Sequence, residues 1–298
     1  MTVLVFLLLL LAGAYVVAVI EGWSHTGRFA PGRPLSAALA LLGQESIVPR
    51  QPDRTLFEAA PPLLLIASVL ASTVLPLTAG GIVVDLATGA LFVNAALAYV
   101  MVALVMAGWG PNSAYAMIGG WRFLGQLIAY SMLIVMPITA VAMRAESLST
   151  VAIVKSQAAL WNVVAQPLGF VLFVLAAMAV SFLPPFDLPT AGSTLAGGAA
   201  GEYSGVRLAI FRLGRLVLIV TVSTAITVFF LGGWLGPILP TWVWTPLKTL
   251  IVIATMLSAG RAMPRLREEH LLSWSWKLGI PLALVNIAWV GVTLLAVP

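Results

Sequence analysis

The side chains that could carry acid–base chemistry are few, and they stand beside long apolar runs. Arg122, Gln126 and Tyr130 recur every four residues at the start of one such run, so they share one helix face. This polar stripe could face a cavity. Alternatively, Arg122 could extend to the membrane interface while Gln126 and Tyr130 bond to neighbouring helices. The sequence leaves both interpretations open.

Three arginines, Arg207, Arg212 and Arg215, stand in the first turns of a later apolar run. Anionic lipid headgroups suit arginines at this depth. Arg215 is deep enough to need a carboxylate partner, which we expect to be Glu202 or Asp187. The simpler alternatives are that Asp187 caps a turn and that Glu202 faces the N-terminus of the helix that follows it.

A third group of charges occupies the short segment GRAMPRLREEHLLSWSWK at 260–277. Its density of charge suits a docking surface for a peripheral partner, and the preference of basic residues for cytoplasmic loops explains it equally well. The candidate docking residues are Arg261, Arg265, Arg267, Glu269 and Lys277.

The composition excludes several classes of protein. The chain is 61% hydrophobic and 8% charged, against about 25% charged residues in soluble domains. It has no cysteine and only two distant histidines, and it lacks a P-loop, a dinucleotide fingerprint and a nucleophile elbow. We therefore expect a chain in a lipid bilayer with no cofactor of its own and no nucleic-acid partner.

Eight apolar stretches reach the roughly 20 residues that a membrane-spanning helix needs. Most Lys and Arg residues fall in the odd-numbered loops, which places loops 1, 3, 5 and 7 in the cytoplasm and both termini outside. The sequence thus predicts an all-α integral membrane protein of about eight transmembrane helices, with residues 1–298 forming a single polytopic domain. The predicted spans lie near 2–20, 56–78, 88–108, 118–143, 160–183, 207–233, 242–260 and 276–297.

Short motifs follow one another in order along the chain. They read GWGPNSAYAMIGGWRFLGQ at 108–126, PFDLP at 185–189, GEYSG at 201–205, FFLGGW at 229–234 and RAMPRLREEHLLSWSWK at 261–277. This succession resembles subunit 1 of respiratory complex I, the proton-translocating NADH:quinone oxidoreductase, which in bacteria is called the H subunit. The resemblance runs from about residue 53 to the end, and the residues before it match poorly.

The resemblance implies an eight-helix subunit of the bacterial plasma membrane, at the junction of the redox and membrane arms. Such a chain contributes to the quinone chamber and holds no redox centre, so activity belongs to the assembly. Quinone would be the substrate of the complex. The implied partners are the quinone-site and iron–sulfur subunits and the small and antiporter-like membrane subunits. The candidates for the chamber and its loops are Arg28, Arg33, Glu45, Phe186, Asp187, Glu202 and Tyr203.

The chain departs from the family at positions that usually carry carboxylates. Losing such a set, one member of it to a cation, predicts that the usual proton path is gone and that the fifth loop packs helices closely instead. Two other functions stay open: the equivalent anchor of a membrane-bound nickel–iron hydrogenase or formate hydrogenlyase-type complex, and a non-catalytic membrane scaffold. The positions concerned are Ser131, Thr190, Gly192, Thr194, Gly197 and Arg215.

Overall fold

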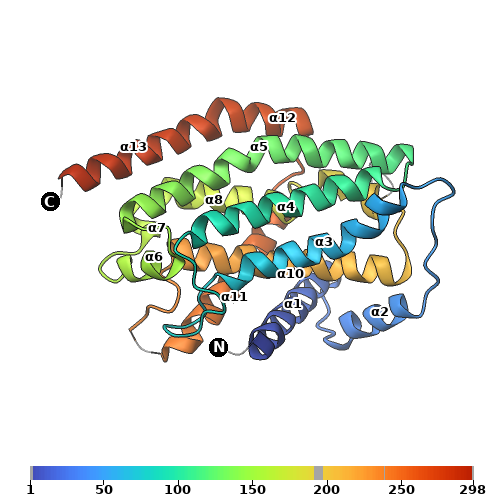
Figure 1. The fold of residues 1–298 in the computed structure, drawn as a ribbon, viewed down its shortest axis with the longest axis horizontal. Helices are drawn as coiled ribbons and strands as arrows, with labels where there is room; N and C mark the ends of the chain where they lie inside the picture. The colour runs from blue at the N-terminus through green and yellow to red at the C-terminus, as the bar shows by residue number, and fades with distance from the viewer. Residues whose placement is uncertain (1–2, 191–196, 238, 297–298) are drawn as a thin grey trace.

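The computed structural model describes residues 3–190, 197–237 and 239–296, in which helices are joined by loops and no strand occurs (Figure 1). The predicted all-α architecture is confirmed. Two 3₁₀ turns, Leu188–Thr190 and Gly198–Ala200, and a π-helical turn, Ser275–Gly279, accompany the α-helices. The α-helices are α1 Val3–Thr26, α2 Gly32–Leu42, α3 Arg54–Thr73, α4 Gly89–Trp109, α5 Ala114–Ala145, α6 Thr150–Ser156, α7 Asn162–Ala165, α8 Pro167–Val180, α10 Gly205–Phe230, α11 Thr241–Ala262, α12 Glu268–Trp274 and α13 Ile280–Ala296.

Seven helices among the described residues are long and apolar enough to cross a membrane. The predicted span at 160–183 instead contains the 14-residue helix α8. Its start is set by Pro167 in the first turn, after Gln166 leaves the helical region at φ −142°. The last predicted span, at 276–297, begins earlier than expected, because α12 continues through the π-helical turn into α13.

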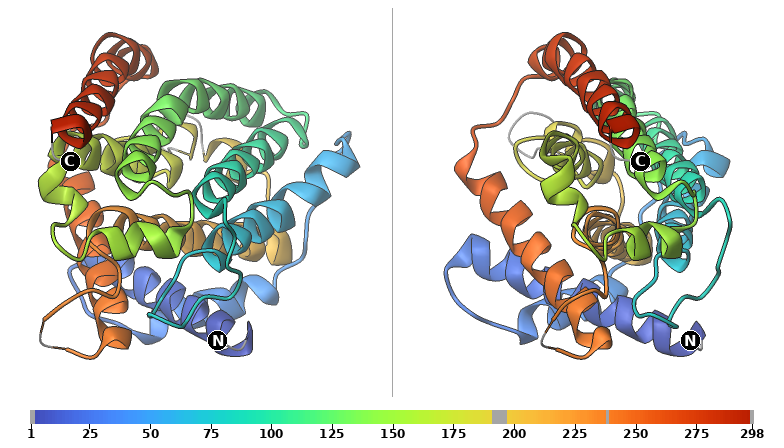
Figure 2. Two further views of the ribbon diagram at one scale, coloured as in Figure 1. Left: turned by 60° about the vertical axis from the view of Figure 1, so that its left-hand side comes forward. Right: turned by 90° about the vertical axis from the view of Figure 1, so that its left-hand side faces the viewer.

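Helix α10 runs through the centre of the bundle, where α1, α3, α8 and α11 contact it (Figure 2). Of its most apolar 18-residue window, 83% is buried inside the protein. The hydroxyls of Thr221, Thr224 and Thr227 donate to the carbonyls four residues earlier in the same helix. Polar side chains in this buried helix therefore need no separate partner.

The C-terminal end of α10 is held by side chains from other segments. Gln157 and Asn162 donate to the carbonyls of Val228 and Phe229 at 2.9 and 2.7 Å. The backbone groups that a helix end leaves unpaired are thereby bonded. Lys248 of α11 donates from Nζ to the carbonyls of Leu231, Gly233 and Leu235 at 2.6, 3.1 and 2.6 Å.

Helix α2 lies within the first loop and was not predicted, because eleven residues are too few to span a bilayer. Leu35, Leu39 and Leu42 recur on one of its faces and are 58%, 60% and 55% exposed. A short helix with an exposed apolar row is typical of the membrane interface.

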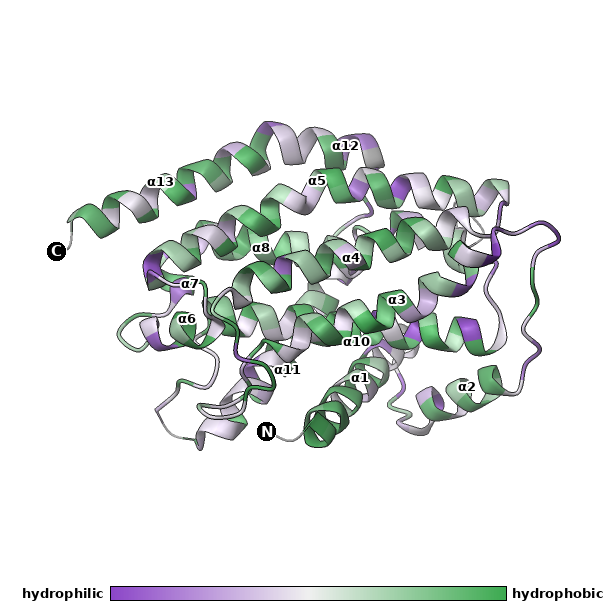
Figure 3. Ribbon diagram, viewed as in Figure 1, coloured by the Kyte–Doolittle hydropathy of each residue, from purple (hydrophilic) through white to green (hydrophobic). Residues whose placement is uncertain are grey.

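Hydrophilic residues gather toward the helix ends, and apolar residues fill most of the helix bodies (Figure 3). At one end of the bundle, which we call the polar end, three loops meet. Asp53 N donates to Gly110 O at 2.9 Å, and Ile47 N donates to Ser204 Oγ at 2.7 Å. The C-terminus lies at the opposite end of the bundle (Figure 1). Which side of the membrane each end faces stays a prediction.

Candidate functional site

A cavity of about 560 Å³, which we call the chamber, lies at the polar end. Residues of the segments 182–190 and 197–203, of the start of α10 and of the end of α1 line it. Its walls combine apolar and aromatic side chains with charged ones, the usual composition of a small-molecule site. The charged lining residues are Glu21, Asp187, Arg212, Arg215 and Arg265, and the larger apolar ones are Phe182, Tyr203, Leu208 and Phe211.

The carboxylates of the chamber are paired with arginines. Arg215 pairs with Glu21 at 2.9 Å, and Arg265 pairs with Asp187 at 2.9 Å. The prediction that Glu202 or Asp187 would pair with Arg215 is therefore wrong, because the packing of α1 on α10 brings Glu21 to it. The exposed Arg212 leaves the lining with one more arginine than carboxylates. Within the described ranges, no three His, Asp or Glu side chains are placed to hold a metal ion.

The polar stripe of α5 hydrogen-bonds to the irregular segment 186–188, which forms one wall of the chamber. Arg122 Nη1 donates to Leu188 O at 3.2 Å, and Gln126 Nε2 donates to Phe186 O at 2.5 Å. Irregular backbone at membrane depth needs such donors. The hydroxyl of Tyr130 is buried without a hydrogen-bond partner among the described residues. The stripe thus supports the chamber wall from behind, and none of its three residues lines the chamber.

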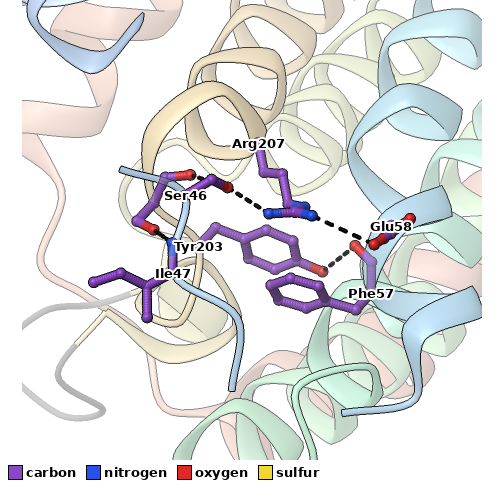
Figure 4. Close-up of polar contacts among 7 residues, drawn as sticks. Ser46, Ile47, Phe57, Glu58, Tyr203 and Arg207 are labelled. Carbon is purple, nitrogen blue, oxygen red and sulfur yellow. Dashed lines mark hydrogen bonds and ion pairs between the residues drawn. The ribbon is translucent and has the colours of Figure 1, made fainter. Parts of the chain in front are cut away.

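Tyr203 joins the chamber wall to α3 (Figure 4). Its ring stacks on Phe57 with centroids 4.6 Å apart, and its hydroxyl donates to Phe57 O at 3.3 Å. Burial raises the pKa of Tyr203 although Arg207 acts in the opposite direction. The phenol therefore stays protonated and keeps its role as a donor.

Arg207 ties the same wall to the first loop and to α3 (Figure 4). Arg207 donates to the hydroxyl of Ser46 and pairs with Glu58 at 3.4 Å. Ser204 Oγ accepts from the backbone of Ile47. These contacts join segments more than 140 residues apart in the sequence.

Substitution of Gly205 by alanine is expected to destabilise the protein by about 2 kcal/mol. Its φ is +56°, and a Cβ there would lie 2.8 Å from Gln44 O, which is backbone and cannot move alone. Thermal unfolding in detergent measures the loss. Gly201, with φ −65°, is the matched control, and Gly201→Ala should leave the midpoint nearly unchanged. Equal midpoints for the two variants would contradict the prediction.

Only some of the residues predicted for the chamber and its loops line the chamber. Asp187 and Tyr203 line it, and Glu21, which we did not predict, completes its charges. Glu202 accepts from Ser113 at 2.7 Å and so faces the start of α5 instead of the helix after it. Arg28 and Arg33 line a separate groove, Glu45 is exposed on the first loop, and Phe186 is buried behind the chamber.

Comparison with known proteins shows the family of this chain. The family model described as NADH dehydrogenase matches residues 1–291. The chain belongs to this family. The match also covers the first 52 residues, where we expected the resemblance to be poor.

Two relatives within the NADH dehydrogenase family cover most of this chain. The NADH-quinone oxidoreductase H subunit of Syntrophotalea carbinolica is 36% identical over 264 residues, which is 86% of this chain and 80% of the relative. The NADH-quinone oxidoreductase H subunit numbered 2 of Syntrophobacter fumaroxidans is 35% identical over 310 residues, which is 96% of this chain and 94% of the relative. The resemblance to the bacterial H subunit is therefore confirmed.

The structure describes some of the positions at which we predicted that carboxylates usual in the NADH dehydrogenase family are replaced. Thr190, Gly197 and Arg215 line the chamber. Ser131 is half-buried in α5 and does not line it. Gly192 and Thr194 lie outside the described residues.

A second groove of about 740 Å³ lies beside the chamber, between the PFDLP segment and α12. His270 and Lys277 line it together with Phe186 and other apolar residues. Three charged residues close to the groove in sequence are exposed, namely Arg261, Arg267 and Glu269. The side chain of Arg265 is 52% exposed and forms an ion pair with Asp187. These residues offer charge at the polar end, and their use in docking stays a prediction.

Proposed function

We propose that this chain is the membrane-anchor subunit of a complex I-like NADH:quinone oxidoreductase of the bacterial plasma membrane. The chamber is the observation that carries the proposal. Residues of the PFDLP and GEYSG segments line this cavity, and its wall contains both apolar side chains and arginines. A quinone has an apolar ring with two carbonyl oxygens, and this lining suits both parts of the molecule.

The chain contributes binding and electrostatics, and electrons come from partner subunits. Phe182, Leu208 and Phe211 would contact the ring, while Arg212 would face the oxygen on which negative charge develops. Tyr203 already donates to Phe57 O, so it holds the wall in place. The chain is therefore a non-redox subunit whose activity belongs to the assembly.

In this proposal residues 1–298 form one polytopic domain at the junction of the two arms. Quinone-site and iron–sulfur subunits would dock on the groove beside α12, which is apolar at its base and charged around it. Small and antiporter-like membrane subunits would contact the lipid-facing helices. Charged residues at the rim of an interface mainly set the orientation and the rate of docking, and they contribute less to its affinity.

The usual carboxylate path from chamber to membrane arm is, in our proposal, interrupted in this chain. Thr190, Gly197 and Arg215 stand where acids are expected, and Glu21 and Asp187 are each paired with an arginine. Quinone reduction would then proceed without a carboxylate relay through these positions.

Affinity purification of the tagged chain in mild detergent, with mass spectrometry of the retained proteins, tests the function. We expect quinone-site, iron–sulfur and antiporter-like subunits. A hydrogenase large subunit with intact metal-binding cysteines would support the hydrogenase-type alternative. A chain recovered alone would support the scaffold alternative.

Leu208→Trp is expected to lower kcat/KM for a water-soluble quinone by about tenfold in the purified complex, because the indole fills part of the chamber. Val206→Trp adds the same group to an exposed position of the same helix that does not line the chamber. Its kinetics should match those of the unmodified complex. If both variants behave alike, quinone does not occupy this cavity.

A further inference from the structure

Three aromatic rings, which we call the aromatic stack, connect α3 to the wall of the chamber. Tyr203 stacks on Phe57 with ring centroids 4.6 Å apart and ring planes 12° apart. It also stacks on Phe211, at 5.8 Å and 18°. Tyr203 and Phe211 line the chamber, whereas Phe57 is buried and does not line it. The positions of two chamber side chains therefore depend on a ring that lies outside the chamber.

The guanidinium group of Arg207 joins the aromatic stack to the first loop and to α3 (Figure 4). Its central carbon lies 5.5 Å from the centroid of the Phe57 ring, within the range of a cation–π interaction. Its two terminal nitrogens donate to the hydroxyl of Ser46 and to a carboxylate oxygen of Glu58. A planar group with several donors can make these three contacts at once. Because Arg207 does not line the chamber, it would affect a ligand there through the residues that it contacts.

The first loop packs directly on the start of α10 beside Arg207. Its residues 44–49, which we call the loop segment 44–49, lie outside helices. Gly205 is so close that a Cβ would lie 2.8 Å from Gln44 O and 3.2 Å from the Cα of Ser46. Ser46 Oγ also donates to Ser204 O at 3.4 Å. A shift of the loop segment would therefore displace the start of α10, since packed backbone has little room to yield.

We propose that Arg207 is a positioning residue for quinone, and that it couples the loop segment 44–49 to occupancy of the chamber. This inference rests on the proposed function of the chamber. A quinone ring against Phe211 would restrict the motion of Phe211 and Tyr203, and the aromatic stack would extend this restriction to Phe57 and Arg207. Arg207 would then hold the loop segment through Ser46. Because such coupling is reciprocal, a loop segment held by Arg207 would strengthen quinone binding by the same factor.

Arg207→Met is expected to raise KM for a water-soluble quinone about fivefold in the purified complex, with kcat within about twofold. The substitution removes the guanidinium group and keeps a long side chain, and Arg207 touches no reacting atom. Arg207→Lys keeps the charge but not the planar group, so its KM should lie between those of Arg207→Met and the unmodified complex. Arg50→Met, the matched control, removes an exposed arginine of the same loop and should leave KM unchanged. A lowered kcat with an unchanged KM in Arg207→Met would overturn the proposal.

Hydrogen exchange of the backbone amides in the loop segment 44–49 measures the coupling itself. In the unmodified complex, a saturating concentration of the water-soluble quinone should slow this exchange at least threefold. The slowing should disappear in Arg207→Met. It should also disappear in Ser46→Ala, which breaks the same contact from the loop at an exposed residue and should not disturb folding. If Arg207→Met keeps the slowing, its altered KM is a general structural effect and the proposal is wrong.

The two readouts also separate this proposal from the proposed function. If Leu208→Trp leaves the quinone kinetics unchanged, quinone does not occupy the chamber and both proposals fail. If Leu208→Trp lowers kcat/KM while quinone leaves the exchange of the loop segment unchanged, the chamber binds quinone and only the role of Arg207 is wrong.

Discussion

Replacing Lys248 with methionine is expected to lower the thermal midpoint of the chain in detergent by roughly 6 to 9 °C, equivalent to about 3 kcal/mol. The ammonium group is the shared donor for three carbonyls in the turn after α10. It also lies 4.2 Å from the ring centroid of Trp161. The residue is 6% exposed, so these carbonyls lose their donor with little access to water.

Lys155→Met is the matched control for this substitution. Lys155 is exposed on α6, and its loss removes the same charge without a set of carbonyl partners. Its midpoint should change by less than about 2 °C. A Lys248→Met variant as stable as the control would show that the turn does not depend on the ammonium group.

The spans were predictable because each depends on a local property. Length and apolar content identified seven of the eight stretches as long helices, and the eighth failed at Pro167, whose ring fixes the helix start. The amphipathic helix α2 was missed because the search required about 20 apolar residues. Its signal was present in the spacing of Leu35, Leu39 and Leu42.

The partners of charged side chains were not predictable in the same way. Arg215 was recognised as too deep to stand alone, yet its partner, Glu21, is 194 residues away on α1. Periodicity shows which residues share a face, but it does not show which helices meet. For the same reason, the stripe of Arg122 and Gln126 was identified, while its partners, carbonyls of the fifth loop, were not.

Arg215→Glu is expected to lower quinone reduction by the purified complex at least tenfold. The new carboxylate would face Glu21, whose oxygen now lies 2.9 Å from the guanidinium of Arg215. Two carboxylates so close repel each other unless one takes up a proton, and they would push α1 from α10 where the chamber closes. The rate is measured with a water-soluble quinone, and native gel electrophoresis checks assembly.

The charge-swapped double variant, Glu21→Arg with Arg215→Glu, distinguishes repulsion from a requirement for arginine at position 215. If the ion pair only holds α1 against α10, the swap restores most of the activity, since neighbours in one pair couple strongly. Arg50→Glu, an exposed inversion of the same size outside the chamber, should leave the rate within about twofold. An active Arg215→Glu single variant would mean that the pair does not shape the chamber. Position 215 is one at which we predicted a family carboxylate. Proton uptake by the Arg215→Glu variant would therefore test our proposal that the carboxylate path is interrupted in this chain.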